Sequence, residues 1–132
     1  MINNIGFREA LAARQKKINS LVCVGIDPLE DKLPLPLATR FGKSSKEAMM
    51  LWLMEYVDST APFASLYKPQ SAFYEGMRSY DGRDVLRFIV AYIHRKYPDI
   101  PVFLDCKRGD IAQTQKQYAV AHLIRDDVDG MN

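Results

Sequence analysis

Charged side chains stand at the ends of three short apolar segments of this 132-residue sequence. They are Asp27, Lys68, Asp105 and Lys107. If the segments are parallel strands, these side chains meet at the carboxyl edge of the sheet, where α/β proteins build their active sites. For a single charged pair, the simpler interpretation is a buried ion pair or a cap at the end of a strand. Four charged groups at the ends of three strands instead predict a functional site.

The densest group is Asp105-Cys-Lys107-Arg108-Gly109-Asp110, continued as Ile111-Ala-Gln-Thr114. Asp105 and Lys107 are two residues apart, so they face the same side if the strand continues that far. Two nearby carboxylates, Asp105 and Asp110, would keep the Lys107 amine protonated at neutral pH. A fixed ammonium stabilises a developing carbanion more in the transition state than in the substrate, and it can donate a proton to that carbanion.

The elements that would position these groups alternate along the chain. Strands are predicted at 21–27, 64–68 and 101–105, and residues 128–132 resemble the start of a fourth. A helix is predicted at 4–20, and a second begins at the capping box Ser44-x-x-Glu47 and stops at Pro62. A third helix carries the apolar stripe Leu86, Ile89, Val90 and Ile93, and Asp110 caps a last helix that runs to about 125. Between 28 and 43, Pro34 and Pro36 exclude a helix.

This order predicts an α/β fold of parallel β/α units. Two architectures fit: a small doubly wound sheet, or part of a (β/α)₈ TIM barrel, which needs about 250 residues. With 132 residues the chain supplies roughly half of such a barrel. Residues 1–132 would then be a single partial domain, from the first strand to the start of the fourth, with a sheet that is left open.

Composition narrows the class of protein. Eighteen basic and sixteen acidic residues leave a net charge of +2, which gives no reason to expect a nucleic-acid or membrane partner. The first twenty residues carry several charges and hold no apolar signal core, so we expect a cytoplasmic protein. The two cysteines, Cys23 and Cys106, are expected to be reduced, buried thiols rather than a disulfide or a metal site.

The segment Asp105-x-Lys107-x-x-Asp110-Ile111-x-x-Thr114 resembles the signature of the orotidine 5′-phosphate decarboxylases. Two further segments are similar to the longer bacterial-type branch of that family. Val24-Gly-Ile-Asp27-Pro resembles its first strand, and Tyr67-Lys68-Pro69-Gln70-Ser-Ala-Phe73-Tyr74-Glu75 resembles its second strand and loop. The match runs in order from about residue 20 to 125, which favours the N-terminal half of a TIM barrel.

The resemblance implies a reaction and a set of roles. The family removes CO₂ from C6 of the orotate ring of orotidine 5′-phosphate, leaving UMP, without a metal or organic cofactor. Lys107 matches the lysine that protonates C6, and Asp105 matches the carboxylate set against the substrate's own. Asp110 and Thr114 match residues donated by the other subunit of a homodimer. Asp27 and Lys68 match strand-end residues that bind the ribose hydroxyls and hold the charged array.

Two alternatives remain open. A sugar-phosphate decarboxylase or aldolase of the same superfamily shares Asp-x-Lys-x-x-Asp but uses Mg²⁺. A non-catalytic half-barrel that binds a nucleotide or a partner chain is the other, because the family's phosphate-binding arginine belongs to later strands. The chain has no glycine-rich phosphate loop of its own. We therefore expect a truncated or split protein that needs a second copy or further strands to close its sheet.

Overall fold

Four parallel strands form the sheet of this protein, whose residues 6–132 are described by a computed structural model. Strand β1 (Cys23–Ile26) pairs with β2 (Leu66–Pro69), and β3 (Phe103–Leu104) pairs with β4 (Gly130–Met131). Single bridges from Tyr67 to Val102 and from Gln70 to Asp105 join the two pairs. The strands therefore lie in chain order, and each connection crosses over between parallel neighbours.

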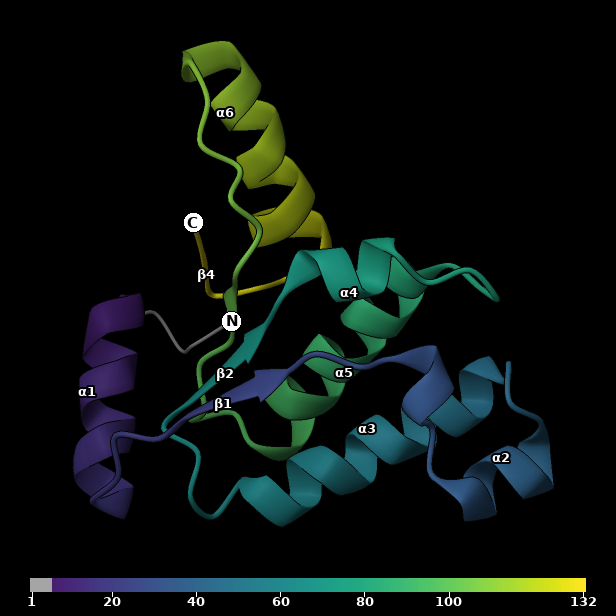
Figure 1. The fold of residues 1–132 in the computed structure, drawn as a ribbon. Coiled ribbons are helices and arrows are strands. Elements are labelled where there is room, and N and C mark those ends of the chain that lie inside the picture. Colours follow the sequence, from purple (N-terminus) through teal and green to yellow (C-terminus); the bar gives the residue numbers. More distant parts are fainter. Residues whose placement is uncertain (1–5) are drawn as a thin grey trace.

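Helices make these crossovers, and Figure 1 shows α3 and α5 together on one side of β1 and β2 while α6 projects away from them. The helices are α1 (Phe7–Ile18), the 3₁₀ turn η1 (Glu30–Lys32), α2 (Leu35–Phe41), α3 (Lys46–Thr60), α4 (Ser71–Glu75), α5 (Gly82–Lys96), α6 (Ala112–Ala119) and the π-helical segment η2 (Val120–Arg125). This is the parallel β/α architecture of the first part of a TIM barrel, as the sequence predicts.

The core lies between the sheet and helices α3 and α5. The predicted stripe of α5 is confirmed, since Leu86, Ile89, Val90 and Ile93 are all buried. In α3 the fully buried positions are Ala48, Met49, Leu53 and Val57, whereas Met50 and Met54 are only partly covered. Tyr67 and Tyr74 complete the core, and each places its hydroxyl on a buried carbonyl, of Val57 and Ile26 respectively.

Helix α1 lies against the amino ends of β2 and β3, where Arg14 is buried. Its guanidinium donates to the carbonyls of Ala61 and Ala64 and forms an ion pair with Asp99 at 2.9 Å. Burial of this cation is tolerated because its donors are occupied by oxygen acceptors. Arg14 thereby fixes α1 to the end of the sheet opposite to the charged strand ends.

Local expectations differ from the structure at several places. Helix α2 forms despite Pro34 and Pro36, because both prolines stand at its start, where a backbone N–H has no helical partner to lose. The cap of α3 is Ser45, which accepts from Ala48 N at 3.1 Å, rather than Ser44. The start of the predicted helix 4–20 lies partly outside the described residues.

The ends of α6 and β1 also depart from prediction. Helix α6 begins after Ile111, and Asp110 does not cap it, since its carboxylate accepts from the N–H of Ile111 itself. Cys106 is buried as expected, but Cys23 is exposed, and Leu21 and Val22 are 80% and 51% exposed. The reason is that no strand of residues 6–132 covers the outer edge of β1.

Within residues 6–132, none of the helices has the length and apolar character needed to cross a membrane.

Candidate active site

Asp105 is the centre of a charged cluster at the carboxyl ends of the strands. Lys107 Nζ lies 2.7 Å from its Oδ1, and Lys68 Nζ lies 3.6 Å from its Oδ2. The Asp105 side chain is 18% exposed, whereas that of Lys107 is 68% exposed. The hydrogen bond from Lys107, followed by one from Asn132, holds the pKa of Asp105 below its ordinary value. The cluster is therefore an ionised carboxylate held between two ammonium groups.

Asp105 and Lys107 meet in a different way from the one the sequence predicts. Strand β3 ends at Leu104 and does not continue to Lys107, which has the left-handed backbone angle φ 51°. A left-handed conformation costs a residue with a Cβ atom about 1–2 kcal/mol. Contacts elsewhere must therefore hold this turn in place.

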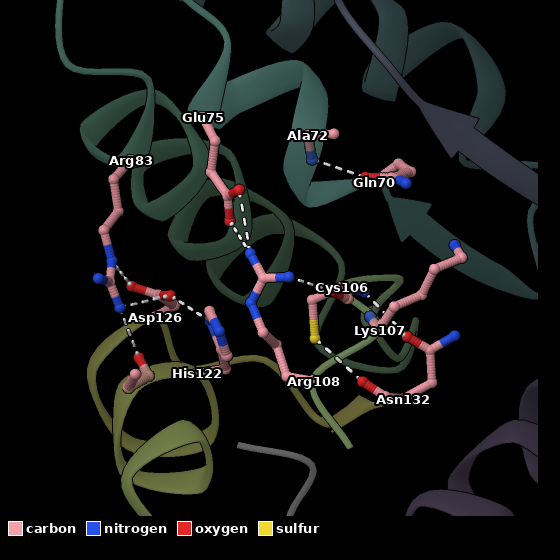
Figure 2. A network of polar contacts seen from close by, with 11 residues as sticks. Gln70, Ala72, Glu75, Arg83, Cys106, Lys107, Arg108, His122, Asp126 and Asn132 are labelled. Carbon is pink, nitrogen blue, oxygen red and sulfur yellow. Dashed lines mark hydrogen bonds and ion pairs between the residues drawn. The ribbon is translucent and has the colours of Figure 1, made fainter. Parts of the chain in front are cut away.

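Asn132 supplies those contacts, and sequence analysis did not single it out. Its Oδ1 accepts from the N–H groups of Cys106 and Lys107 at 2.9 and 2.8 Å, while its Nδ2 donates to Asp105 Oδ1 at 3.1 Å. Figure 2 shows its amide facing this stretch of backbone. A signal was available, because Asn132 is a polar residue at the end of the predicted fourth strand.

Arg108 anchors the far side of the turn. It donates to the carbonyl of Cys106 at 2.8 Å and binds both oxygens of Glu75 at 2.8 and 3.0 Å (Figure 2). Sequence analysis gave no role to Arg108. In the structure Arg108 joins the loop after β3 to the end of α4. Contacts with α4 as well as with β4 therefore hold this loop in place.

Asp27 lies at the same edge of the sheet but binds the backbone rather than a lysine. Its Oδ1 accepts from the N–H of Gln70 at 3.1 Å, next to the start of α4. Behind it, a pocket of 330 Å³ is lined by residues of β1, α3 and the turn after β1. They are Gly25, Ile26, Asp27, Pro28, Trp52, Leu53 and Tyr56.

Asp110 and Thr114 stay outside the cluster of their own chain. Asp110 is exposed, and within residues 6–132 it forms no ion pair with Lys107. Thr114 is half-buried on the first turn of α6. Of the predicted site residues, the structure thus brings Lys68, Asp105 and Lys107 into direct contact. Among the described residues, no three His, Cys, Asp or Glu side chains gather as metal ligands.

Comparison with known proteins assigns the family. Residues 20–132 match the model of the Orotidine 5′-phosphate decarboxylase / HUMPS family. The chain belongs to this family.

Curated members of the orotidine 5′-phosphate decarboxylase family are similar over most of this chain. The orotidine 5′-phosphate decarboxylase of Ralstonia nicotianae is 43% identical over 113 residues, which are 86% of this chain and 39% of that protein. The one of Leptospira interrogans is 36% identical over 119 residues, or 90% of this chain and 41% of that protein. The chain therefore spans about two fifths of the length of these relatives.

Solved structures of the family share the fold. A Toxoplasma gondii protein assigned as an orotidine-monophosphate decarboxylase superposes with a TM-score of 0.80 at 33% identity, covering 96% of this chain and 39% of that one. Leishmania donovani OMP decarboxylase superposes with a TM-score of 0.73 at 29% identity, covering 96% and 43%. The fold expected from the resemblance, the N-terminal part of a barrel, is confirmed.

Proposed function

We propose that the protein carrying this chain converts orotidine 5′-phosphate to UMP and CO₂, a step of pyrimidine biosynthesis. The observation that carries the proposal is the Lys68–Asp105–Lys107 cluster at the carboxyl ends of β2 and β3, in a chain whose family is shown. The curated relatives named above carry the name of this activity. Residues 1–132 would form the proton-donating part of the enzyme, as one partial domain.

The reaction follows from the position of the ammonium. The bond between C6 and the carboxylate carbon breaks, CO₂ leaves, and the electron pair stays on C6. Lys107 Nζ donates a proton to C6, becomes a neutral amine, and regains a proton from water. Because the cation is already held by Asp105 at 2.7 Å, it needs little reorientation as charge develops on C6. No cofactor takes part in this scheme.

The proposed roles of Asp110 and Thr114 require a second subunit. Lys107 is 68% exposed and has one carboxylate partner among residues 6–132, which leaves one side of the ammonium open. A homodimer that brings Asp110 and Thr114 of one chain to Lys107 of the other would fill that side. Asp27 and Lys68 are proposed to bind the ribose hydroxyls of the same substrate.

The test is decarboxylation of orotidine 5′-phosphate by the native polypeptide that carries residues 1–132, followed as release of labelled CO₂ with and without EDTA. Turnover that is indifferent to the chelator is expected. Turnover of a sugar phosphate instead, lost with EDTA, would assign the Mg²⁺-dependent alternative. Tight UMP binding in calorimetry without turnover would leave a protein that only binds the nucleotide.

A further inference from the structure

We propose that Asn132 is the positioning residue that sets the geometry of Asp105 and Lys107. The inference rests on the proposed function, because it concerns the proton donor of that reaction. Asn132 would not touch the reacting atoms. It would act through the backbone of Lys107 and the carboxylate of Asp105.

The contacts of Asn132 cover every residue of one short segment. Its side chain binds the N–H groups of Cys106 and Lys107 and the carboxylate of Asp105. Its backbone carbonyl accepts from Arg108 N at 2.9 Å and from Cys106 Sγ at 3.2 Å. Four consecutive residues, 105–108, are thus held by a single residue.

Two successive N–H groups that converge on one oxygen explain the left-handed backbone of Lys107. Successive amides around a left-handed residue form a concave donor site that binds an anion or a carbonyl oxygen. In this protein the site is filled by Asn132 Oδ1, at 2.9 Å from Cys106 N and 2.8 Å from Lys107 N. Without that acceptor the two N–H groups would lose the contact that most directly favours φ 51° at Lys107.

An amide is the side chain that fits this position. It must accept two hydrogen bonds on one atom and donate one from the other, and only asparagine or glutamine offers both. An aspartate would still accept the two N–H groups, but it could not donate to Asp105 and would place a second negative charge beside it. The contact to Asp105 is one of those that lower its pKa.

Strand pairing brings Asn132 to the site. Phe103 pairs with Gly130 and Leu104 pairs with Met131, so the residue after Met131 lies beside Asp105. On the other side, Gln70 forms a bridge with Asp105. Asp105 is therefore flanked by an amide residue from each neighbouring strand end, and only that of Asn132 reaches its carboxylate among the described residues.

The experiment compares Asn132→Asp and Asn132→Ala with a matched change in the same strand, Asp129→Asn. Asp129 binds His94 and accepts from the N–H of Val102. Asparagine at this position keeps an oxygen acceptor for Val102, and with it the register of β4, but weakens the contact with His94 and leaves the amide of Asn132 in place. All variants are made in the native polypeptide, and kcat, KM and thermal midpoint are measured across pH.

Both Asn132 variants are expected to lose about 10- to 100-fold in kcat with KM changed far less, because misplacement of the donor affects the transition state. In Asn132→Asp the acid limb of the kcat profile should move up by about one pH unit, since a second carboxylate opposes ionisation of Asp105. Asp129→Asn should lower the thermal midpoint and leave the acid limb in place. An unmoved limb in Asn132→Asp, or the same shift in Asp129→Asn, would overturn the proposal.

A second readout separates this inference from the proposed function. The carboxyl carbon of Asp105 and the amide of Lys107 are followed by NMR during a pH titration without substrate. If the native protein fails to decarboxylate orotidine 5′-phosphate, the proposed function is wrong. The positioning role is still decided by whether these two signals move in Asn132→Asp and stay unchanged in Asp129→Asn.

Discussion

The ammonium of Lys107 reaches the carboxylate of Asp105 at 2.7 Å across a left-handed turn of the backbone. The two side chains are two residues apart and do not share a strand, since β3 ends at Leu104. The ion pair therefore depends on the turn, and the turn depends on contacts from β4. Substitutions of Lys107, of the residues that bind it, and of the sheet edge should therefore change activity and stability in different ways.

The first prediction concerns Lys107, the proposed proton donor. Lys107→Ala should reduce decarboxylation in the native polypeptide by at least about 100-fold, because an acid in place contributes about 10²–10⁴-fold. The control is Lys16→Ala, an exposed lysine on α1 at the other end of the sheet. Steady-state kinetics measure both variants. Substantial turnover by Lys107→Ala would contradict the assigned role.

The second prediction concerns the origin of Asp110. Lys107→Ala and Asp110→Ala should each be nearly inactive, but a mixture of the two should recover activity if each site takes Asp110 from the partner chain. Random exchange makes half the dimers hybrid with one intact site, so about a quarter of the native activity is expected for a two-fold dimer. Activity is measured after mixing at equal concentration. Failure to complement would place Asp110 in the site of its own chain.

The third prediction concerns a buried carboxylate outside the Lys68–Asp105–Lys107 cluster. Asp126 has a fully buried side chain that accepts from Arg83 at 3.0 Å and from His122 at 2.9 Å (Figure 2). It also accepts from Arg87 at 2.9 Å. Burial alone would raise its pKa, but hydrogen bonds from Arg83, His122 and Arg87 lower it below the ordinary value. Asp126→Ala should lower the free energy of unfolding by about 1–3 kcal/mol. The loss falls mainly on His122, because the Arg83 and Arg87 side chains are 42% and 41% exposed and water can hydrate them.

The sign of the pH effect follows from that lowered pKa. The stability contributed by Asp126 should be fully present above about pH 4, the ordinary range of an aspartate, and lost as pH falls through its folded pKa. Urea unfolding at several pH values measures it. Asp31→Asn is the control, because Asp31 is 73% exposed and pairs only with Lys32 among the described residues. A loss for Asp126→Ala that persists unchanged at low pH would contradict the account.

The fourth prediction concerns the open edge of the sheet. A polypeptide of residues 1–132 alone should self-associate, since the outer edge of β1 is unpaired within the described chain and Leu21 beside it is 80% exposed. Leu21→Lys should reduce association, while Leu35→Lys, at an equally exposed position on α2, should not. Light scattering after size exclusion gives the mass. A stable, dilute monomer would count against the open-sheet account.

The spacing of apolar residues predicted much of the fold, because helices and strands form largely from interactions between residues close in the sequence. The stripe on α5 repeats at helical spacing, so its core face can be assigned from the sequence, and the structure buries all four residues. Helix α2 was missed because the rule against proline applies to helix interiors, and Pro34 and Pro36 stand at its start. The short strand β3 was placed correctly, but its end was not, since the turn at Lys107 depends on a residue outside the segment.

Contacts made through strand pairing could not be predicted in the same way. The residues of the charged cluster were identified by type and position, and Lys68, Asp105 and Lys107 do meet. The contact from Asn132 to Asp105 spans 27 residues and exists only when β4 is in register with β3. The burial of His122 against Asp126 also depends on packing between η2 and α5, for which the sequence shows no motif.

Helix α1 has a consequence for how the protein should be produced in the laboratory. The family match begins at residue 20, but Arg14 already caps the carbonyls of Ala61 and Ala64 and binds Asp99. A recombinant version trimmed to residues 20–132 would leave two carbonyls and a carboxylate without their partner at the base of the sheet. The unit that folds thus starts before the family match, and expression boundaries should include α1.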